Sequence, residues 1–81
     1  MSYTPENIAE LDILMLFDLC TSQAGIKIHK TAKPTAIAAA NSLFKKGFIT
    51  QEDGGYLTSL GIVAAEHAQN LYTLLNTPVG E

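Results

Sequence analysis

The chain has 81 residues, of which 47% are apolar, and it carries a formal net charge of −3. This length gives room for one domain with one core, and the composition excludes a disordered chain. A single cysteine, Cys20, excludes an internal disulfide, and its place in an apolar run predicts a small core residue rather than a reactive thiol. We see no export signal and no apolar run long enough to cross a bilayer, so we expect a cytoplasmic protein without membrane contact.

The first expected element is a helix from Thr4 to about Thr21, with Thr4 as its cap and Pro5 at its first position. Its apolar residues fall on two faces of the helical wheel, whereas a surface helix needs only one apolar stripe. One face holds Ile8, Leu11, Leu14, Met15 and Leu19, and the other holds Ala9, Ile13, Leu16, Phe17 and Cys20. In a domain this small, the second stripe indicates contact with a second subunit.

A short strand and a second helix follow. Residues 22–25 break the first helix, and the alternation of apolar and polar residues over 26–28 is typical of a strand. The second helix is expected from Pro34 to Lys46, since the residue before a proline avoids the helical conformation and Gly47 is a common helix stop. Its expected buried face is Ala36, Ile37, Ala40, Leu43 and Phe44, and its expected outer face is Thr35, Ala38, Ser42, Lys45 and Lys46.

The last part of the chain predicts a hairpin and a third helix. Residues 48–51 and 55–58 flank Glu52-Asp53-Gly54, and Asp-Gly is a strong hairpin signal. The third helix, capped by Thr58 or Ser59, is expected from about Leu60 to Asn76. We therefore predict one α+β domain over residues 1–77, mainly helical with a small β-hairpin, and a loose tail over residues 78–81.

The first and third helices carry more apolar surface than one small domain can cover, which predicts a homodimer. The pattern leaves open which of the two helices forms the interface. The residues expected there are Ile13, Leu16, Phe17, Leu71, Tyr72 and Leu75.

The charges are divided along the chain. All 5 cations are lysines within residues 27–46, a stretch without any acid, and all 8 acids lie outside it. Such a division predicts one positive surface on a negative body, which is either an anion-binding face or an ordinary solvated face. The lysines are Lys27, Lys30, Lys33, Lys45 and Lys46.

No pattern in the sequence points to catalysis or to a cofactor. Ser42 and Ser59 lack an arranged base, and the carboxylates are scattered. His29 and His67 are isolated and the chain has one cysteine, so no metal-ligand set is visible, and His67 is expected to pack in the core or in an interface. We therefore expect a protein that is not an enzyme and that holds no metal and no cofactor.

The order helix, short strand, helix, hairpin, helix resembles a winged helix-turn-helix. Residues 43–49 (Leu-Phe-Lys-Lys-Gly-Phe-Ile), followed by 53–58 (Asp-Gly-Gly-Tyr-Leu-Thr) and Leu60-Gly61, are similar to the recognition-helix end, wing and following helix of MarR- and PadR-like bacterial regulators. In those proteins a leucine, a basic pair and Gly-Leu-Ile precede a turn, Tyr-Leu-Thr and a glycine. The resemblance covers about residues 34–61. The whole chain also resembles a small family of uncharacterised bacterial proteins, which implies no function.

The resemblance implies a dimeric transcriptional regulator that binds double-stranded DNA, with the second helix in the major groove and the hairpin at the backbone. Carried over by position, the residues facing the groove are Thr35, Ala38, Ser42 and Lys45. Lysines 27, 30, 33 and 46 then lie near phosphates, where each adds affinity through counterion release.

A second hypothesis stays open beside DNA binding. The chain has no arginine, which is the residue that most often reads guanine, and its wing tip carries Glu52 and Asp53. These features favour a winged helix that serves as a protein-interaction module and docks its positive face on an acidic partner without any DNA contact.

Overall fold

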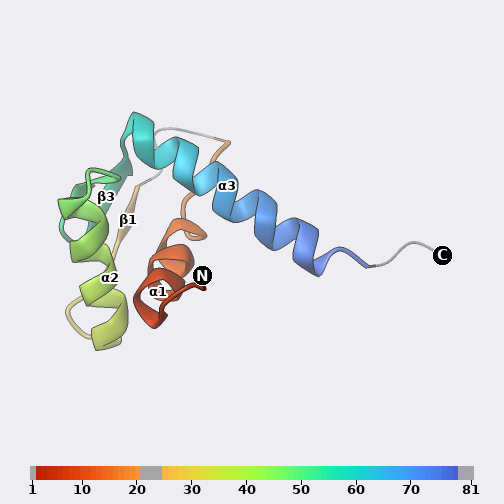
Figure 1. Ribbon diagram of the computed structural model, residues 1–81. Coiled ribbons are helices and arrows are strands. Elements are labelled where there is room, and N and C mark those ends of the chain that lie inside the picture. The colour runs from red at the N-terminus through yellow and green to blue at the C-terminus, as the bar shows by residue number, and fades with distance from the viewer. Residues whose placement is uncertain (1, 21–24, 79–81) are drawn as a thin grey trace.

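The computed structural model describes residues 2–20 and 25–78, which form three helices and one three-stranded antiparallel sheet (Figure 1). The α+β class predicted from the sequence is confirmed. The elements, in chain order, are α1 (Pro5–Leu14), β1 (Ile26–Lys27), α2 (Pro34–Lys45), β2 (Ile49–Gln51), β3 (Gly54–Leu57) and α3 (Ser59–Asn76).

The sheet has the order β1-β3-β2, so the last strand of the hairpin lies in the middle. Ile26 of β1 pairs with Gly55 of β3, and Ile49 of β2 pairs with Leu57 of β3. Gly54 has a positive φ of 127°, and an added Cβ would come within 2.5 Å of the Ile26 carbonyl oxygen. The close pairing of β1 with the hairpin therefore depends on a glycine at this position.

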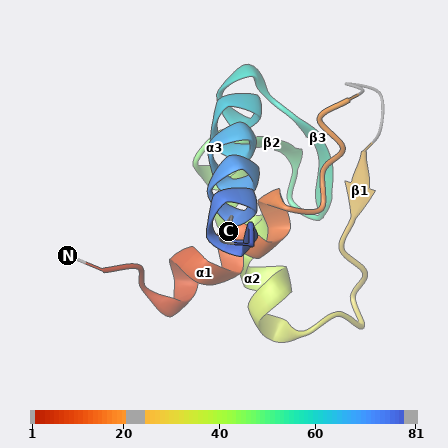
Figure 2. The ribbon, with the colours of Figure 1, turned by 90° about the vertical axis from the view of Figure 1, so that its right-hand side faces the viewer.

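The core lies where the three helices meet the inner end of the hairpin. The α1 segment crosses α2 and passes beneath α3, an arrangement that is clear when α3 is viewed end-on (Figure 2). The buried apolar residues are Ile13, Leu14, Phe17, Ala39, Ala40, Leu43, Ile49, Ala65 and Ala68. Because α2 and α3 contribute alanines, their backbones can approach the neighbouring helices closely.

Helix α1 ends at Leu14, earlier than the predicted end near Thr21, which itself lies outside the described residues. The Gln69 amide on α3 donates hydrogen bonds to the carbonyl oxygens of Leu14 (3.2 Å) and Phe17 (2.8 Å). The Asp18 carboxylate accepts from the backbone N–H of Cys20 at 2.8 Å, which favours a turn. A side chain 52 residues or more away along the chain thus satisfies carbonyls that a longer helix would have used.

The expectation for Cys20 was wrong, and of the two places expected for His67, the core or an interface, the core is excluded. Cys20 is exposed rather than packed in the core, because α1 has already ended before it. His67 is also exposed within the single chain, and the buried positions of its helix are Gly61, Ala65 and Ala68.

The expected buried face of α2 is rotated relative to the prediction. Ala39, Ala40 and Leu43 are buried, whereas Ile37 and Phe44 are both partly exposed to solvent. The reason is that α1 and the hairpin pack on the small side chains of α2, so the core is centred on alanines rather than on its largest residues.

The ends of the other elements agree with the local signals. Thr4 and Thr58 cap α1 and α3, with their hydroxyls accepting from the N–H groups of Asn7 and Gly61, each at 3.0 Å. Gly47 adopts a φ of 86° directly after α2, as expected for a helix stop.

None of the described helices is long and apolar enough to cross a membrane. Of the helix break predicted over residues 22–25 and the tail predicted over residues 78–81, residues 22–24 and 79–81 lie outside the described residues.

The second half of α3 extends away from the rest of the fold, as its blue end shows (Figure 1). Every described residue from Leu71 to Pro78 is exposed. Two residues predicted at a dimer interface, Ile13 and Phe17, are only 3% and 4% exposed because they form the core of the chain itself. Of the expected interface residues, Leu16, Leu71, Tyr72 and Leu75 remain on the surface.

Candidate functional site

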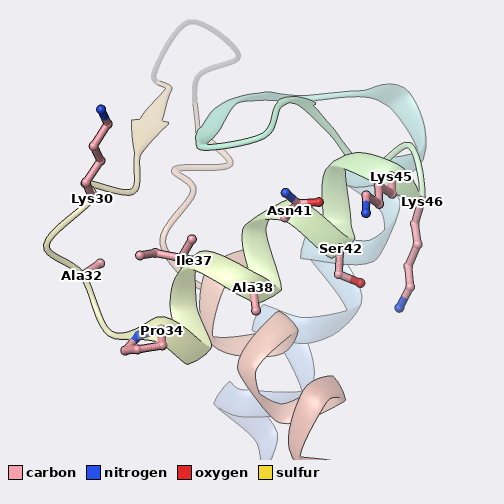
Figure 3. Close-up of a pocket in the computed structure, with 9 residues that line it drawn as sticks. All are labelled: Lys30, Ala32, Pro34, Ile37, Ala38, Asn41, Ser42, Lys45 and Lys46. Atoms are coloured by element: carbon pink, nitrogen blue, oxygen red, sulfur yellow. The ribbon is translucent and has the colours of Figure 1, made fainter.

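A groove of about 780 Å³ runs along the outer face of α2 and the loop before it (Figure 3). Lysines lie toward its two ends, and small or polar side chains lie between them. No acidic residue is among the residues that line it, which are Lys30, Ala32, Pro34, Ile37, Ala38, Asn41, Ser42, Lys45 and Lys46. We call this surface the α2 groove.

Local sequence signals explain how the α2 groove is positioned. Pro34 occupies the first turn of α2, where its missing N–H is not needed. The N–H of Ala32 donates to the carbonyl oxygen of His29 at 2.9 Å, and this turn holds Lys30 opposite the helix. Because the side chains of Ile37, Asn41 and Lys45 are four residues apart, they form one stripe on the helix surface.

Lys46 and Ser42, two of the predicted contact residues, are already engaged within the chain. The Lys46 ammonium lies 2.6 Å from a Glu10 carboxylate oxygen, and the Ser42 hydroxyl donates to the same oxygen at 2.7 Å. The other oxygen of Glu10 accepts from the Asn7 amide at 3.2 Å. This cluster, which we call the Glu10 cluster, joins α1 to the last turn of α2.

The electrostatics of the Glu10 cluster favour a charged carboxylate. Burial by itself raises the pKa of Glu10, because it disfavours the ionised form. Hydrogen bonds from Lys46, Ser42 and Asn7, together with the positive charge of Lys46, act in the opposite direction and outweigh burial. The pKa of Glu10 therefore lies below its ordinary value of 4.5.

The remaining lysines differ in their surroundings. The Lys27 ammonium lies 3.8 Å from a carboxylate oxygen of Asp53. Because both side chains are exposed, this ion pair adds little to the stability of the fold. Within residues 2–20 and 25–78, the ammonium groups of Lys30, Lys33 and Lys45 make no ion pair and no side-chain hydrogen bond. These three are the lysines whose charge is available to an outside anion.

Thr35 lies apart from the other predicted contact residues. It lines a smaller, mostly apolar hollow of about 220 Å³ between α1 and α2, which also includes Glu6, Ala9 and Glu10. Ala38 borders both this hollow and the α2 groove. The structure thus brings Ala38, Ser42, Lys30, Lys45 and Lys46 together and places Thr35 at the edge.

The acidic tip of the hairpin reaches toward the α2 groove. The Asn41 amide lies 3.4 Å from a carboxylate oxygen of Glu52. Glu52 and Asp53 share a second hollow, of about 320 Å³, with Lys30, Ile37 and Asn41. One edge of the basic surface is therefore bordered by two carboxylates.

Sequence reasoning missed three residues of this region: Ile37, Asn41 and Glu10. Ile37 and Asn41 could have been found from their four-residue spacing to Lys45, which places them on one helix face. No sequence signal identifies Glu10 as the partner of Lys46, since the two are 36 residues apart. Among the residues that the structure describes, no three His, Cys, Asp or Glu side chains are grouped as they would be to hold a metal ion.

Comparison with protein families places the chain in a described family. A family model described as "Family of unknown function (DUF5669)" covers residues 1–76. No curated protein and no solved structure matches the chain.

Proposed function

The chain belongs to this family, whose description names no activity, and we propose from the α2 groove that it binds double-stranded DNA as a dimeric transcriptional regulator. The observation that carries the proposal is the α2 groove itself, which has lysines and no acid among its lining residues. An exposed helix with this character suits the polyanionic major groove of DNA, which is wide enough to admit a helix.

In this proposal the fold is a winged helix-turn-helix. The order α1-β1-α2-β2-β3-α3 and the joining of β1 to the hairpin are consistent with it. Helix α2 is then the recognition helix and the β2–β3 hairpin is the wing. The short turn at His29–Ala32 takes the place of the helix that ordinarily precedes a recognition helix.

Four residues of the α2 groove, together with the neighbouring Lys33, contact DNA in this proposal. Lys30, Lys33 and Lys45 contact phosphates, because their charges are not used inside the described part of the chain. Asn41 reads a base edge after its amide leaves the Glu52 carboxylate, since an asparagine amide matches the donor and acceptor pair of adenine. Ala38 offers a methyl group for contact with thymine.

The same charges limit how strongly one chain can bind. Three phosphate contacts correspond to a salt slope of about −2.7 in log–log form, since each contact contributes about −0.9. Glu52 and Asp53 repel phosphates at the wing. The proposal therefore describes binding that is weak for one chain and depends on two chains acting together.

Two observations count against DNA readout and so favour a second candidate function, a protein-interaction module that binds an acidic partner. The carboxylates at the hairpin tip border the α2 groove, and the chain has no arginine for bidentate readout of guanine. In this alternative the same three lysines contact carboxylates of a partner protein.

The test is fluorescence anisotropy of a labelled mixed-sequence duplex across a salt series, comparing wild type with Lys45→Ala and Lys30→Ala. We expect each variant to bind the duplex several-fold more weakly than wild type. The slope of log affinity against log salt should become shallower by about 1 for each chain that loses its lysine–phosphate contact. Lys46 is left unchanged, because its substitution would break the Glu10 cluster and disturb the fold.

The matched control is Asn70→Asp, which also lowers the net charge by one but lies exposed on α3. This variant should bind the duplex as wild type does. Absence of binding by folded wild type at low salt would reject the DNA proposal and favour the acidic partner. An equal loss in Asn70→Asp and Lys45→Ala would show that net charge, and not the α2 groove, governs binding.

A further inference from the structure

The second half of α3 lacks cover from its own chain. Leu74 and Leu75 are 73% and 74% exposed, and Tyr72 is also largely exposed. Between Glu66 and the end of α3 there is no Asp, Glu, Lys or Arg. A short helix gains little stability from its own hydrogen bonds, so an apolar, uncharged helix end of this kind requires packing against another surface.

An apolar hollow lies beside this helix end. It has a volume of about 240 Å³ and lies between α1 and the second half of α3, where the two helices cross (Figure 2). A cavity of about 150 Å³ already holds a benzene-sized group, so this hollow can accept a leucine or tyrosine side chain. Its lining residues are Tyr3, Ile8, Leu11, Asp12, Met15, Ala68, Leu71, Tyr72 and Leu75.

The surface area of the chain indicates how much is left uncovered. The chain exposes 5928 Å², whereas a compact monomer of its mass exposes about 4,700 Å². Its radius of gyration is 13.1 Å, against about 11.7 Å for a compact chain of this length. The excess area of roughly 1,200 Å² is comparable to the ~800 Å² that each partner contributes to a standard interface.

We propose that a second copy of this chain covers this surface, with the second half of α3 of each copy packed into the α1–α3 hollow of the other. The projecting apolar helix and the apolar hollow lie on the same face, so the face is self-complementary, as an isologous two-fold interface requires. We call it the α1–α3 face.

Charge does not oppose a second copy at this face, although it does over the rest of the surface. Each chain carries a net charge of −3, so two copies repel each other across most of their surfaces. Among the residues that line the α1–α3 hollow only Asp12 is charged, and two copies can therefore meet there with little repulsion. The interface uses Ile8, Met15 and Leu75, in place of the buried Ile13 and Phe17 expected from the sequence.

This inference deepens the dimer of the proposed function, but it rests on a different surface. The α2 groove and the α1–α3 hollow have no lining residue in common. A chain that dimerises and fails to bind DNA would refute the DNA proposal alone. A chain that binds DNA as a monomer would refute the dimer, here and in the proposed function, and leave the α2 groove as the DNA contact.

The test is the molar mass of the full chain by size-exclusion chromatography with light scattering, at about 100 μM, for wild type, Leu75→Glu and Leu60→Glu. We expect wild type and Leu60→Glu to have twice the mass of 8.7 kDa, and Leu75→Glu to have the mass of one chain. Leu60 is the matched control, because it is an exposed leucine on α3 outside the hollow.

A monomeric wild type would overturn the proposal, and so would a dimeric Leu75→Glu or the dissociation of both variants. Amide hydrogen exchange on wild type gives a second measurement that needs no substitution. The protection of the backbone amides of residues 71–76 against hydrogen exchange should rise at least tenfold between a chain concentration at which monomers dominate and one at which dimers dominate. Unchanged protection there would overturn the proposal as well.

Discussion

At the scale of single residues, Glu10 is the side chain whose chemistry most constrains the fold. It is 7% exposed, yet it stays ionised because Lys46, Ser42 and Asn7 all donate to it. A buried carboxylate without such partners would be strongly destabilising. The Glu10 cluster therefore fixes α1 against the last turn of α2. It also pairs the positive charge of Lys46 with a carboxylate, so that this charge is not available to an outside anion.

We expect Glu10→Gln to lower the free energy of unfolding at pH 7 by about 1.5–3 kcal/mol, the range for hydrogen bonds to charged groups. Since the folded-state pKa of Glu10 lies below its ordinary value of 4.5, the contribution of the carboxylate is complete above that pH. It is lost as the pH falls through the folded-state value. Urea unfolding of wild type and variant from pH 7 to pH 3 measures the difference, which should shrink over the acidic part of this range.

Glu66→Gln provides the control for this series, because Glu66 is exposed on α3. It should change the free energy of unfolding by less than about 0.5 kcal/mol at every pH. A difference between wild type and Glu10→Gln that stayed constant down to pH 3 would argue against a role for the ionised carboxylate.

At the scale of elements, the start of α3 is tied to the end of α2 by a compact joint. The Thr58 N–H donates to the Phe48 carbonyl oxygen at 3.0 Å, and the Thr58 hydroxyl donates to the Gly47 carbonyl oxygen at 2.6 Å. Gly61 lies directly against this joint, and a Cβ built there would overlap the Phe48 carbonyl oxygen. The approach of the α3 backbone to the hairpin therefore requires a glycine.

Gly61→Ala should lower the free energy of unfolding by about 1–3 kcal/mol, as expected for overpacking. Helix propensity alone predicts the opposite sign, since alanine is favoured over glycine by about 1 kcal/mol. Asn70→Ala, on the exposed side of the same helix, should stabilise slightly. Thermal and urea unfolding of the two variants measure both signs, and a stabilising Gly61→Ala would disprove the close approach.

The limits of the α1 prediction also belong to this scale. Thr4, Pro5, Thr58 and Gly47 act on their own neighbours in the chain, so the starts of α1 and α3 and the stop after α2 were predictable. The end of α1 was not, because Gln69 on α3 supplies the donors for its carbonyls.

At the scale of the whole molecule, the chain is elongated, with extents of 44 × 28 × 24 Å. Its two candidate surfaces, the α2 groove and the α1–α3 face, are built from separate residues. A mainly basic surface and an uncharged apolar surface on one small fold can each be altered without changing the other. The dimer and the DNA contact are therefore open to independent tests.

A dimer makes thermal stability depend on concentration, because association favours the folded state by mass action. A hundredfold rise in chain concentration adds about 2.7 kcal/mol to the free energy of unfolding of each dimer. For two chains of this size, this corresponds to a rise of about 8 °C in Tm. Differential scanning calorimetry of wild type should detect this shift. Leu75→Glu should show the same Tm at all concentrations.

The sequence by itself determined the class of each element, most helix ends and the hairpin, because caps, glycine stops and Asp-Gly turns act between near neighbours. It also determined that the lysines gather in one segment. Only the tertiary structure decided which lysines remain available, since Lys46 is bound by Glu10 from another helix. It likewise placed Ile13 and Phe17 in the core and left Leu75 outside. Burial and pairing depend on contacts between residues distant in sequence, which no local pattern records.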